Sequence, residues 1–255
     1  MYKIGLCSVT FRNLTVEQVI KLAHGANMEG IEWGGDFHVP PGDTIRAAEV
    51  AELTEQANLE IVSYGSYYRV GHEKEGIPFD VVLETAQRLK APSIRVWAGK
   101  IGSHEIDEKY RTAVVEDARR IAELAEKQDI EINFEYHGGT LTDNVESALL
   151  LVNEINHPNI HLYWQPAVGE TINKRLKSIE KLSAWLTHIH VFHWNYTDRL
   201  SFSEGVVEWE QYLSKLKKDK NVHYLLMEFV KGDNIEQFLK DAKALKNLVV
   251  YGNLP

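Results

Sequence analysis

Four polar side chains in the second half of the chain are of the types that bind divalent metal ions. They are Glu135, Gln165, His190 and Glu228, and each lies at or near the end of a short apolar run. Two carboxylates that lie close together repel each other unless a cation lies between them. A neutral imidazole and an amide oxygen complete a set of nitrogen and oxygen ligands. The four residues therefore predict one divalent metal ion (Mn²⁺, Mg²⁺, Co²⁺ or Zn²⁺), provided that the fold brings them together.

The apolar runs that carry these residues belong to a pattern of strand, loop and helix that repeats along the chain. Strands are expected at 3–8, 30–34, 60–64, 93–98, 130–135, 160–165, 188–192 and 224–229. Their starts lie about 30 residues apart, which is the period of a β/α unit. Amphipathic helices are expected between them at 16–26, 45–57, 107–127, 145–155, 172–185, 207–218 and 235–248.

The alternation of strands and helices favours a parallel sheet. No G-x-G-x-x-G motif follows the first strand, and no linker or change of composition divides the chain. We therefore predict a single-domain (β/α)₈ TIM barrel that spans residues 1–255. Alternate residues of a barrel strand point inward, and catalytic groups come from the carboxyl ends of the strands. Glu135, Gln165, His190 and Glu228 should therefore meet at the barrel mouth.

The bulk properties narrow the class of protein. The formal net charge of −9 argues against a nucleic-acid partner, because such partners favour basic surfaces. The single cysteine, Cys7, excludes an intrachain disulfide and fits a reducing cytoplasm. No signal peptide is recognised, and no stretch approaches the roughly 18 apolar residues of a membrane span. We expect a cytoplasmic protein without a membrane partner.

Five short motifs lie on or at the ends of the predicted strands: Gly30-Ile31-Glu32-Trp33, Ile94-Arg95-Val96-Trp97, Phe134-Glu135-Tyr136-His137, His188-Ile189-His190 and Met227-Glu228-Phe229. Through these motifs, and over essentially its whole length, the chain resembles the xylose isomerase-like TIM barrel superfamily. This superfamily contains sugar isomerases and epimerases, inosose dehydratase, dehydroshikimate dehydratase and endonuclease IV. The resemblance implies that Glu135, His190 and Glu228 are metal ligands. The pattern usually has Asp where this chain has Gln165. An amide brings no charge, so the ion should bind more weakly and act as a stronger Lewis acid.

The resemblance implies a metal-dependent isomerase or epimerase that acts on a sugar or a sugar-like polyol ketone through a cis-enediolate. Glu135 and Glu228 would remove and return the proton next to the carbonyl, and His137 could shuttle a proton between oxygens. Polar and aromatic side chains near predicted strand ends are candidate contacts for a carbohydrate substrate: His38, Arg69, Arg95, Trp97, His193 and Trp194. Barrels of this superfamily often pair through their mouth loops, so a homodimer is expected.

Three other functions remain open. A dehydratase needs the same Lewis acid and base, and its product would distinguish it from an isomerase. An endonuclease of the endonuclease IV type carries an Asp-x-His pair after the seventh strand, whereas this chain reads Asp198-Arg199-Leu200 and is acidic. A non-catalytic sugar-binding barrel would follow if Gln165 marks a lost metal site.

Overall fold

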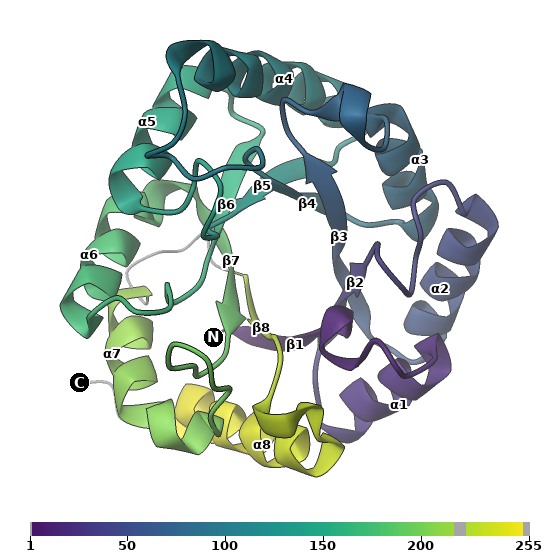
Figure 1. Cartoon of the computed structure of the whole chain (residues 1–255). Coiled ribbons are helices and arrows are strands. Elements are labelled where there is room, and N and C mark those ends of the chain that lie inside the picture. The colour runs from purple at the N-terminus through teal and green to yellow at the C-terminus, as the bar shows by residue number, and fades with distance from the viewer. Residues whose placement is uncertain (1, 217–222, 252–255) are drawn as a thin grey trace.

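Eight parallel strands form a closed barrel in the computed structural model, which describes residues 2–216 and 223–251. Each strand pairs with the next along the chain, and β1 closes the barrel by pairing with β8 (Figure 1). The strands are β1 (Lys3–Cys7), β2 (Gly30–Gly34), β3 (Glu60–Arg69), β4 (Ser93–Trp97), β5 (Glu131–Glu135), β6 (Ile160–Trp164), β7 (Leu186–Val191) and β8 (Tyr224–Met227). The predicted (β/α)₈ barrel is confirmed.

Eight α-helices within the described residues surround the barrel (Figure 1). They are α1 (Val16–Gly25), α2 (Thr44–Gln56), α3 (Phe79–Leu89), α4 (Glu108–Glu126), α5 (Val145–Ile155), α6 (Ile172–Leu182), α7 (Val206–Leu216) and α8 (Ile235–Tyr251). Short 3₁₀ helices lie at Ser8–Phe11, Glu73–Glu75, Ser183–Trp185, Phe202–Gly205 and Lys231–Asp233. None of the helices in the described part of the chain has the length and apolar character needed to cross a bilayer.

The structure adds one helix to those predicted and extends β3 past its predicted end, while β7 begins two residues earlier than predicted. Helix α3 begins after Pro78 without a side-chain cap, so only its apolar spacing marks it. Strand β3 continues past the predicted end at residue 64 as far as Arg69. The predicted helix at 207–218 corresponds to α7, which ends at Leu216; the last two predicted residues lie outside the described part of the chain.

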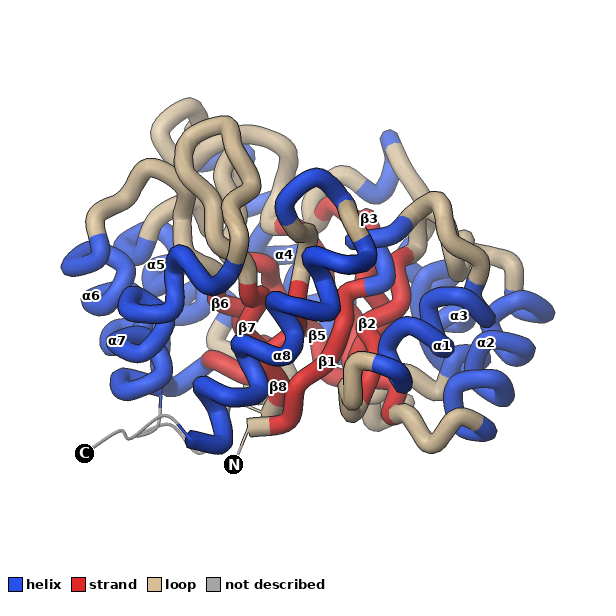
Figure 2. Tube along the Cα trace, turned by 90° about the horizontal axis from the view of Figure 1, so that it is seen from below, coloured by secondary structure: helices blue, strands red, loops and turns tan. Residues whose placement is uncertain are grey.

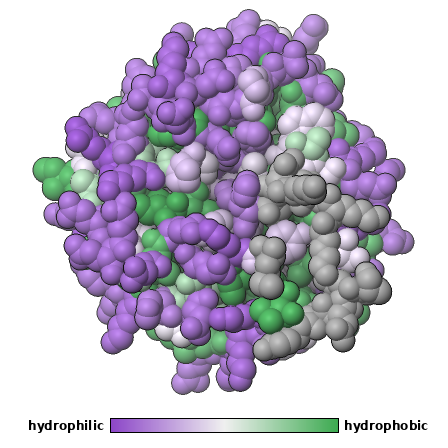
Figure 3. Space-filling model, turned by 180° about the vertical axis from the view of Figure 1, so that it is seen from behind, coloured by the Kyte–Doolittle hydropathy of each residue, from purple (hydrophilic) through white to green (hydrophobic). Residues whose placement is uncertain are grey.

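Side chains of the strands separate into two layers. Outward residues such as Ile31, Phe134 and Trp164 pack against the helices in the main apolar core. A smaller cluster fills the lower barrel with Cys7, Val62, Tyr163, Tyr224 and Leu226. The longest loops follow the carboxyl ends of the strands and stand together at one end of the barrel (Figure 2). At the opposite end, mostly hydrophilic side chains surround scattered hydrophobic ones (Figure 3). Functional sites of such barrels lie at the carboxyl ends of the strands, which is the end that carries the long loops.

Candidate metal centre

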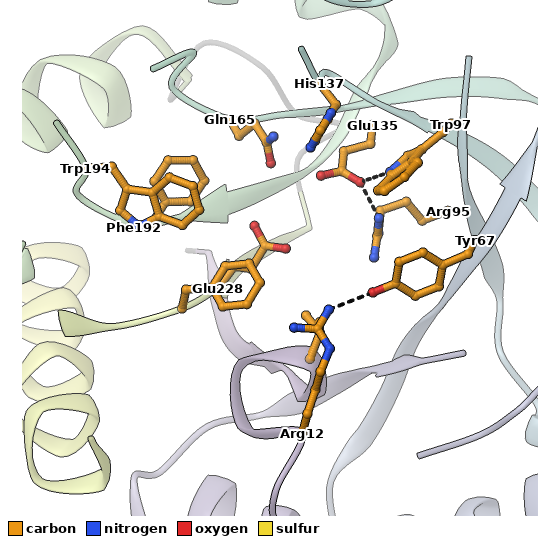
Figure 4. A pocket seen from close by; sticks show the side chains of 12 residues that line it. Arg12, Tyr67, Arg95, Trp97, Glu135, His137, Gln165, Phe192, Trp194 and Glu228 are labelled. Carbon is orange, nitrogen blue, oxygen red and sulfur yellow. Dashed lines mark hydrogen bonds and ion pairs between the residues drawn. The ribbon is translucent and has the colours of Figure 1, made fainter. Parts of the chain in front are cut away.

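The predicted metal donors meet at the mouth of the barrel. Figure 4 shows three of them, Glu135, Gln165 and Glu228. Glu135 ends β5, Gln165 follows β6, His190 lies on β7 and Glu228 follows β8. One ligand atom from each of Glu135, His190 and Glu228 lies within 4.8 Å of the others, and all three residues are buried. The barrel register therefore assembles side chains that are far apart in the sequence.

Three oxygens surround the Nδ1 atom of His190. Gln165 Oε1 lies 2.9 Å from this nitrogen, Glu228 Oε2 lies 3.4 Å away and Glu135 Oε1 lies 3.7 Å away. A first-row divalent ion with bonds of about 2.0–2.2 Å holds neighbouring donors roughly 3–3.5 Å apart. The nitrogen and oxygen donors, and their spacing, fit such an ion.

Glu32 supports His190 from the other side of the ring. The Nε2 atom of His190 lies 3.7 Å from Glu32 Oε1 and has no hydrogen-bond partner in the described part of the chain. A carboxylate behind a histidine ligand commonly fixes its tautomer and orientation. Glu32 is not among the predicted site residues. The available signal was a charged residue in the apolar run Gly30-Ile31-Glu32-Trp33, on the face opposite Ile31 and Trp33.

Arg95 links Glu32 to Glu135 beneath the cavity. Its Nε donates to Glu32 Oε1 at 2.9 Å, and its Nη1 forms an ion pair with Glu135 Oε2. The indole N–H of Trp97 donates to the same Glu135 oxygen. Glu135 Oε1 is therefore the oxygen that faces His190. A Cβ at Gly65 would lie 2.9 Å from both Arg95 Nη2 and Glu32 Oε1, so only glycine leaves room for this pair.

The electrostatics of this cluster suit a cation. Burial would raise the pKa of Glu32, but Arg95 and His190 together outweigh burial and lower this pKa to about 2. Burial acts the same way on Glu135, and Arg95 and His190 again lower the pKa. Burial and the charge of Glu135 raise the pKa of Glu228. Ionisation of all three carboxylates beside the one guanidinium of Arg95 would leave two negative charges among these four buried side chains, and a divalent ion would balance them.

A cavity of about 210 Å³ opens above these donors (Figure 4). Trp97 and His137 stack on one of its sides, with ring centroids 5.0 Å apart, and Phe192 and Trp194 stack on another at 4.4 Å. The His137 Nδ1 atom contacts the Gly138 carbonyl at 2.6 Å, which leaves Nε2 for a ligand. The lining residues are Val9, Arg12, Tyr67, Arg95, Trp97, Glu135, His137, Gln165, Phe192, Trp194, Glu228 and Phe229.

The structure separates the predicted substrate contacts. Arg95, Trp97 and Trp194 line the cavity, whereas His38 and His193 are not among its lining residues. His38 is buried and bonds to the Leu14 carbonyl at 3.1 Å. The ring of His193 packs against Gly205, where an added Cβ would lie 2.4 Å from Nδ1. Arg69 lines a neighbouring cavity. His38 and His193 are thus held by the Leu14 carbonyl and beside Gly205, outside the lining of this cavity, and their role in substrate binding stays a prediction.

Tyr67, Phe192 and Phe229 line the cavity without having been predicted as contacts. Tyr67 lies in the part of β3 beyond the predicted strand end. Phe229 has a positive φ of 53°, a backbone conformation that sequence patterns do not reveal for an aromatic residue. Phe192 lies two residues after His190, so alternation along the strand was the available signal for it. Phe229 directly follows Glu228, so alternation alone would turn its ring outward.

Comparison with known proteins agrees with the fold. The family model for xylose isomerase-like TIM barrels matches residues 20–248. A 3-dehydroshikimate dehydratase from Bacillus anthracis is 24% identical over 279 aligned residues, which cover 96% of this chain and 97% of that protein. The solved structure of the probable 3-DHS dehydratase AsbF from Bacillus anthracis, involved in petrobactin synthesis, has a TM-score of 0.79 at 20% identity and covers 96% of this chain and 99% of its own.

A structure of the IOLI protein with a bound zinc atom has a TM-score of 0.78 at 18% identity, with 98% of both chains covered. These structural likenesses concern the fold. The family match extends over most of the chain, from α1 to α8. This chain belongs to the xylose isomerase-like TIM barrel family.

Proposed function

We propose that this chain is a divalent-metal-dependent dehydratase that removes a proton beside the carbonyl of a small hydroxylated ketone and then expels a β-hydroxyl group as water. The observation that carries the proposal is the convergence of Glu135, His190 and Glu228 on the floor of a cavity that His137 also lines. When bound, the ion would polarise the substrate carbonyl. Glu135, Gln165, His190 and Glu228 would hold it.

His137 is the side chain best placed to move the proton. Its ring stacks on Trp97 and its Nδ1 contacts the Gly138 carbonyl, so the ring plane is fixed and Nε2 is left for the substrate. In the proposed reaction Nε2 takes the proton from the carbon next to the carbonyl. The same ring then gives the proton to the departing hydroxyl, so that water leaves and a carbon–carbon double bond forms.

The unequal surroundings of the two carboxylates favour elimination over two-base epimerisation. Glu135 Oε2 accepts hydrogen bonds from both Arg95 and Trp97, which makes this carboxylate a weak base. Epimerisation by Glu135 and Glu228 would need two comparable bases on opposite sides of one carbon. The dehydratase relative, which aligns with nearly the whole chain, supports the same outcome.

Isomerisation or epimerisation, the first expectation from the sequence, is the second candidate. Glu228 favours it, because its carboxylate lines the cavity and lies apart from the Arg95 and Trp97 donors that hold Glu135. His137 would remove a proton from one face of the substrate, and a protonated Glu228 would give another proton to the opposite face, which leaves His137 protonated and Glu228 ionised. The products separate the two reactions: dehydration yields a compound lighter by one water, whereas isomerisation conserves mass.

The test begins with the metal content of the purified protein, measured by elemental mass spectrometry after incubation with Mn²⁺ or Zn²⁺. We expect about one ion per chain in the wild type and none in Glu228→Gln. The matched control is Glu210→Gln, an exposed acid on α7 that should keep the ion. Mass spectrometry of products from keto-cyclitols and ketoses then identifies the reaction. A wild type that holds no metal and converts none of them would refute the proposal and favour a sugar-binding barrel.

A further inference from the structure

Strand β3 carries two inward-facing side chains beyond the level of the metal donors. Its register with β4 pairs Gly65 with Arg95 and Arg69 with Trp97. Between these two pairs β3 advances by four residues and β4 by two, so β3 holds two extra residues. Half-buried Tyr67 and Arg69 alternate there with buried Tyr68, whose hydroxyl donates to Asp117 on α4. Because alternate strand residues face opposite ways, Tyr67 and Arg69 face the mouth.

Arg69 is fixed in direction but has no acidic partner in the described part of the chain. Its guanidinium lies 3.9 Å from the centroid of the Trp97 ring and donates one hydrogen bond to the Gly99 carbonyl at 3.3 Å. The other arginines beside the metal cavity are engaged: Arg12 pairs with Asp36, and Arg95 pairs with Glu32 and Glu135. Most N–H donors of Arg69 are therefore available to a ligand.

A second cavity of about 180 Å³ lies beside Arg69 and shares Tyr67 with the metal cavity. Two acids line it, and each already has a cationic partner: Glu73 pairs with Arg120 at 3.0 Å and Glu75 pairs with Lys100. An incoming anion at this place would meet the unpaired guanidinium of Arg69 rather than unpaired carboxylates.

We propose that Arg69 binds an oxyanion, a carboxylate or a phosphate, carried by the substrate whose carbonyl lies over the metal donors. The planar guanidinium matches two oxygens of such a group, and its stacking on Trp97 aims it before the ligand arrives. Trp97 in turn donates to Glu135. The anion site and the metal site are therefore joined through one indole ring, and the natural substrate is an anionic ketone. The substrate assignment rests on the proposed function; the anion site itself does not.

Inorganic phosphate tests the anion site without the metal. Phosphate is titrated into the full chain after treatment with a chelator, and binding is followed by calorimetry and by tryptophan fluorescence. We expect saturable millimolar binding that weakens at least about tenfold in Arg69→Met, because a charge-assisted hydrogen bond is lost. Arg69→Lys keeps the positive charge and should therefore retain part of the phosphate affinity. Arg46→Met, at a partly exposed arginine on α2 paired with Glu49, is the control.

The absence of saturable binding in the wild type, or equal binding in wild type and Arg69→Met, would overturn the proposal. With the metal-loaded enzyme, Arg69→Met should raise KM for a ketone acid and leave KM for its methyl ester unchanged. If phosphate binding is lost while both KM values stay the same, the site takes free anions and the substrate assignment is wrong. If phosphate binding depends on Arg69 but no ketone is converted, the anion site stands and the proposed dehydratase is refuted.

Discussion

The floor and the rim of the metal cavity are built in different ways. The floor consists of Glu32, Arg95, Glu135 and His190, all buried, and its guanidinium is paired with two carboxylates within the protein. The rim consists of His137 and Trp194, and Arg69 lies beside it in the neighbouring cavity. All three are half-buried and are held by ring stacking or carbonyl contacts. The floor is thus set by the barrel before any ligand arrives, whereas the rim keeps donors for the ligand.

This difference assigns separate tasks to the two regions. Buried ion pairs fix geometry because removing one partner leaves an uncompensated charge. Half-buried side chains that stack on aromatic rings can change with little effect on folding. Substitutions in the floor should therefore change stability and metal affinity, and substitutions in the rim should change ligand preference.

The largest effect is expected from Arg95→Met. It leaves Glu32 and Glu135 buried without their shared cation, and the loss should lower the free energy of unfolding by about 3–5 kcal/mol. Urea denaturation measures this value, with Arg46→Met as a control that should change it by less than about 0.5 kcal/mol. A decrease of less than about 1 kcal/mol in the free energy of unfolding would mean that Glu32 and Glu135 do not depend on Arg95 for charge compensation.

Glu32→Gln should act on the metal more than on the fold. The amide oxygen still accepts from Arg95, but the charge behind His190 Nε2 is gone, and metal affinity should fall about 10–100-fold. Competition with a chelator measures the affinity of Mn²⁺ or Zn²⁺. Glu29→Gln, at an exposed acid just before β2, is the control. An unchanged metal affinity in Glu32→Gln would mean that Glu32 does not orient His190 for metal binding.

Gln165→Glu tests the departure from the family pattern. The new carboxylate has the length of the amide and should strengthen metal binding about tenfold or more, because it adds a charge beside the ion. Turnover should slow, since the more neutralised ion is a weaker Lewis acid. The same titrations and initial rates measure both effects. Weaker binding in this variant would show that Gln165 lies outside the coordination sphere.

The smallest effect concerns His38, which the structure places outside the cavity. Burial lowers its pKa, although the bond to the Leu14 carbonyl opposes the shift. In the unfolded chain the pKa of His38 is about 6.5, so the unfolded chain binds the proton first as the pH falls. Stability should be retained above that pH and decline below it, by less than about 1.4 kcal/mol per pH unit from this group.

His38→Gln should make this decline shallower without changing ligand binding. Denaturation midpoints between neutral and mildly acidic pH measure how stability declines with pH. The control is His104→Gln, at an exposed histidine. A change of KM in His38→Gln would return this residue to the list of substrate contacts.

The sequence predicted the strands and the donors that share one face of a strand, because inward alternation can be read from residues such as Asn133 and Glu135. It could not predict the ion pairs of Arg95, since they join β2, β4 and β5 through a barrel register that no local pattern contains. The two extra residues of β3, which bring Tyr67 to the cavity, could not be predicted either, because they appear only in the register of β3 with β4. The bond of His38 to the Leu14 carbonyl could not be predicted either, because it depends on loop conformation.

Phe229 follows Glu228 with a left-handed backbone, and its N–H donates to Thr10 Oγ1 at 3.0 Å. For a bulky residue this conformation costs of the order of 1–3 kcal/mol, a cost that glycine largely avoids. The ring nevertheless lines the cavity. A library of variants selected for heat resistance should therefore collect glycine at position 229, whereas one selected for turnover should keep the aromatic ring. The two selections would diverge at this residue.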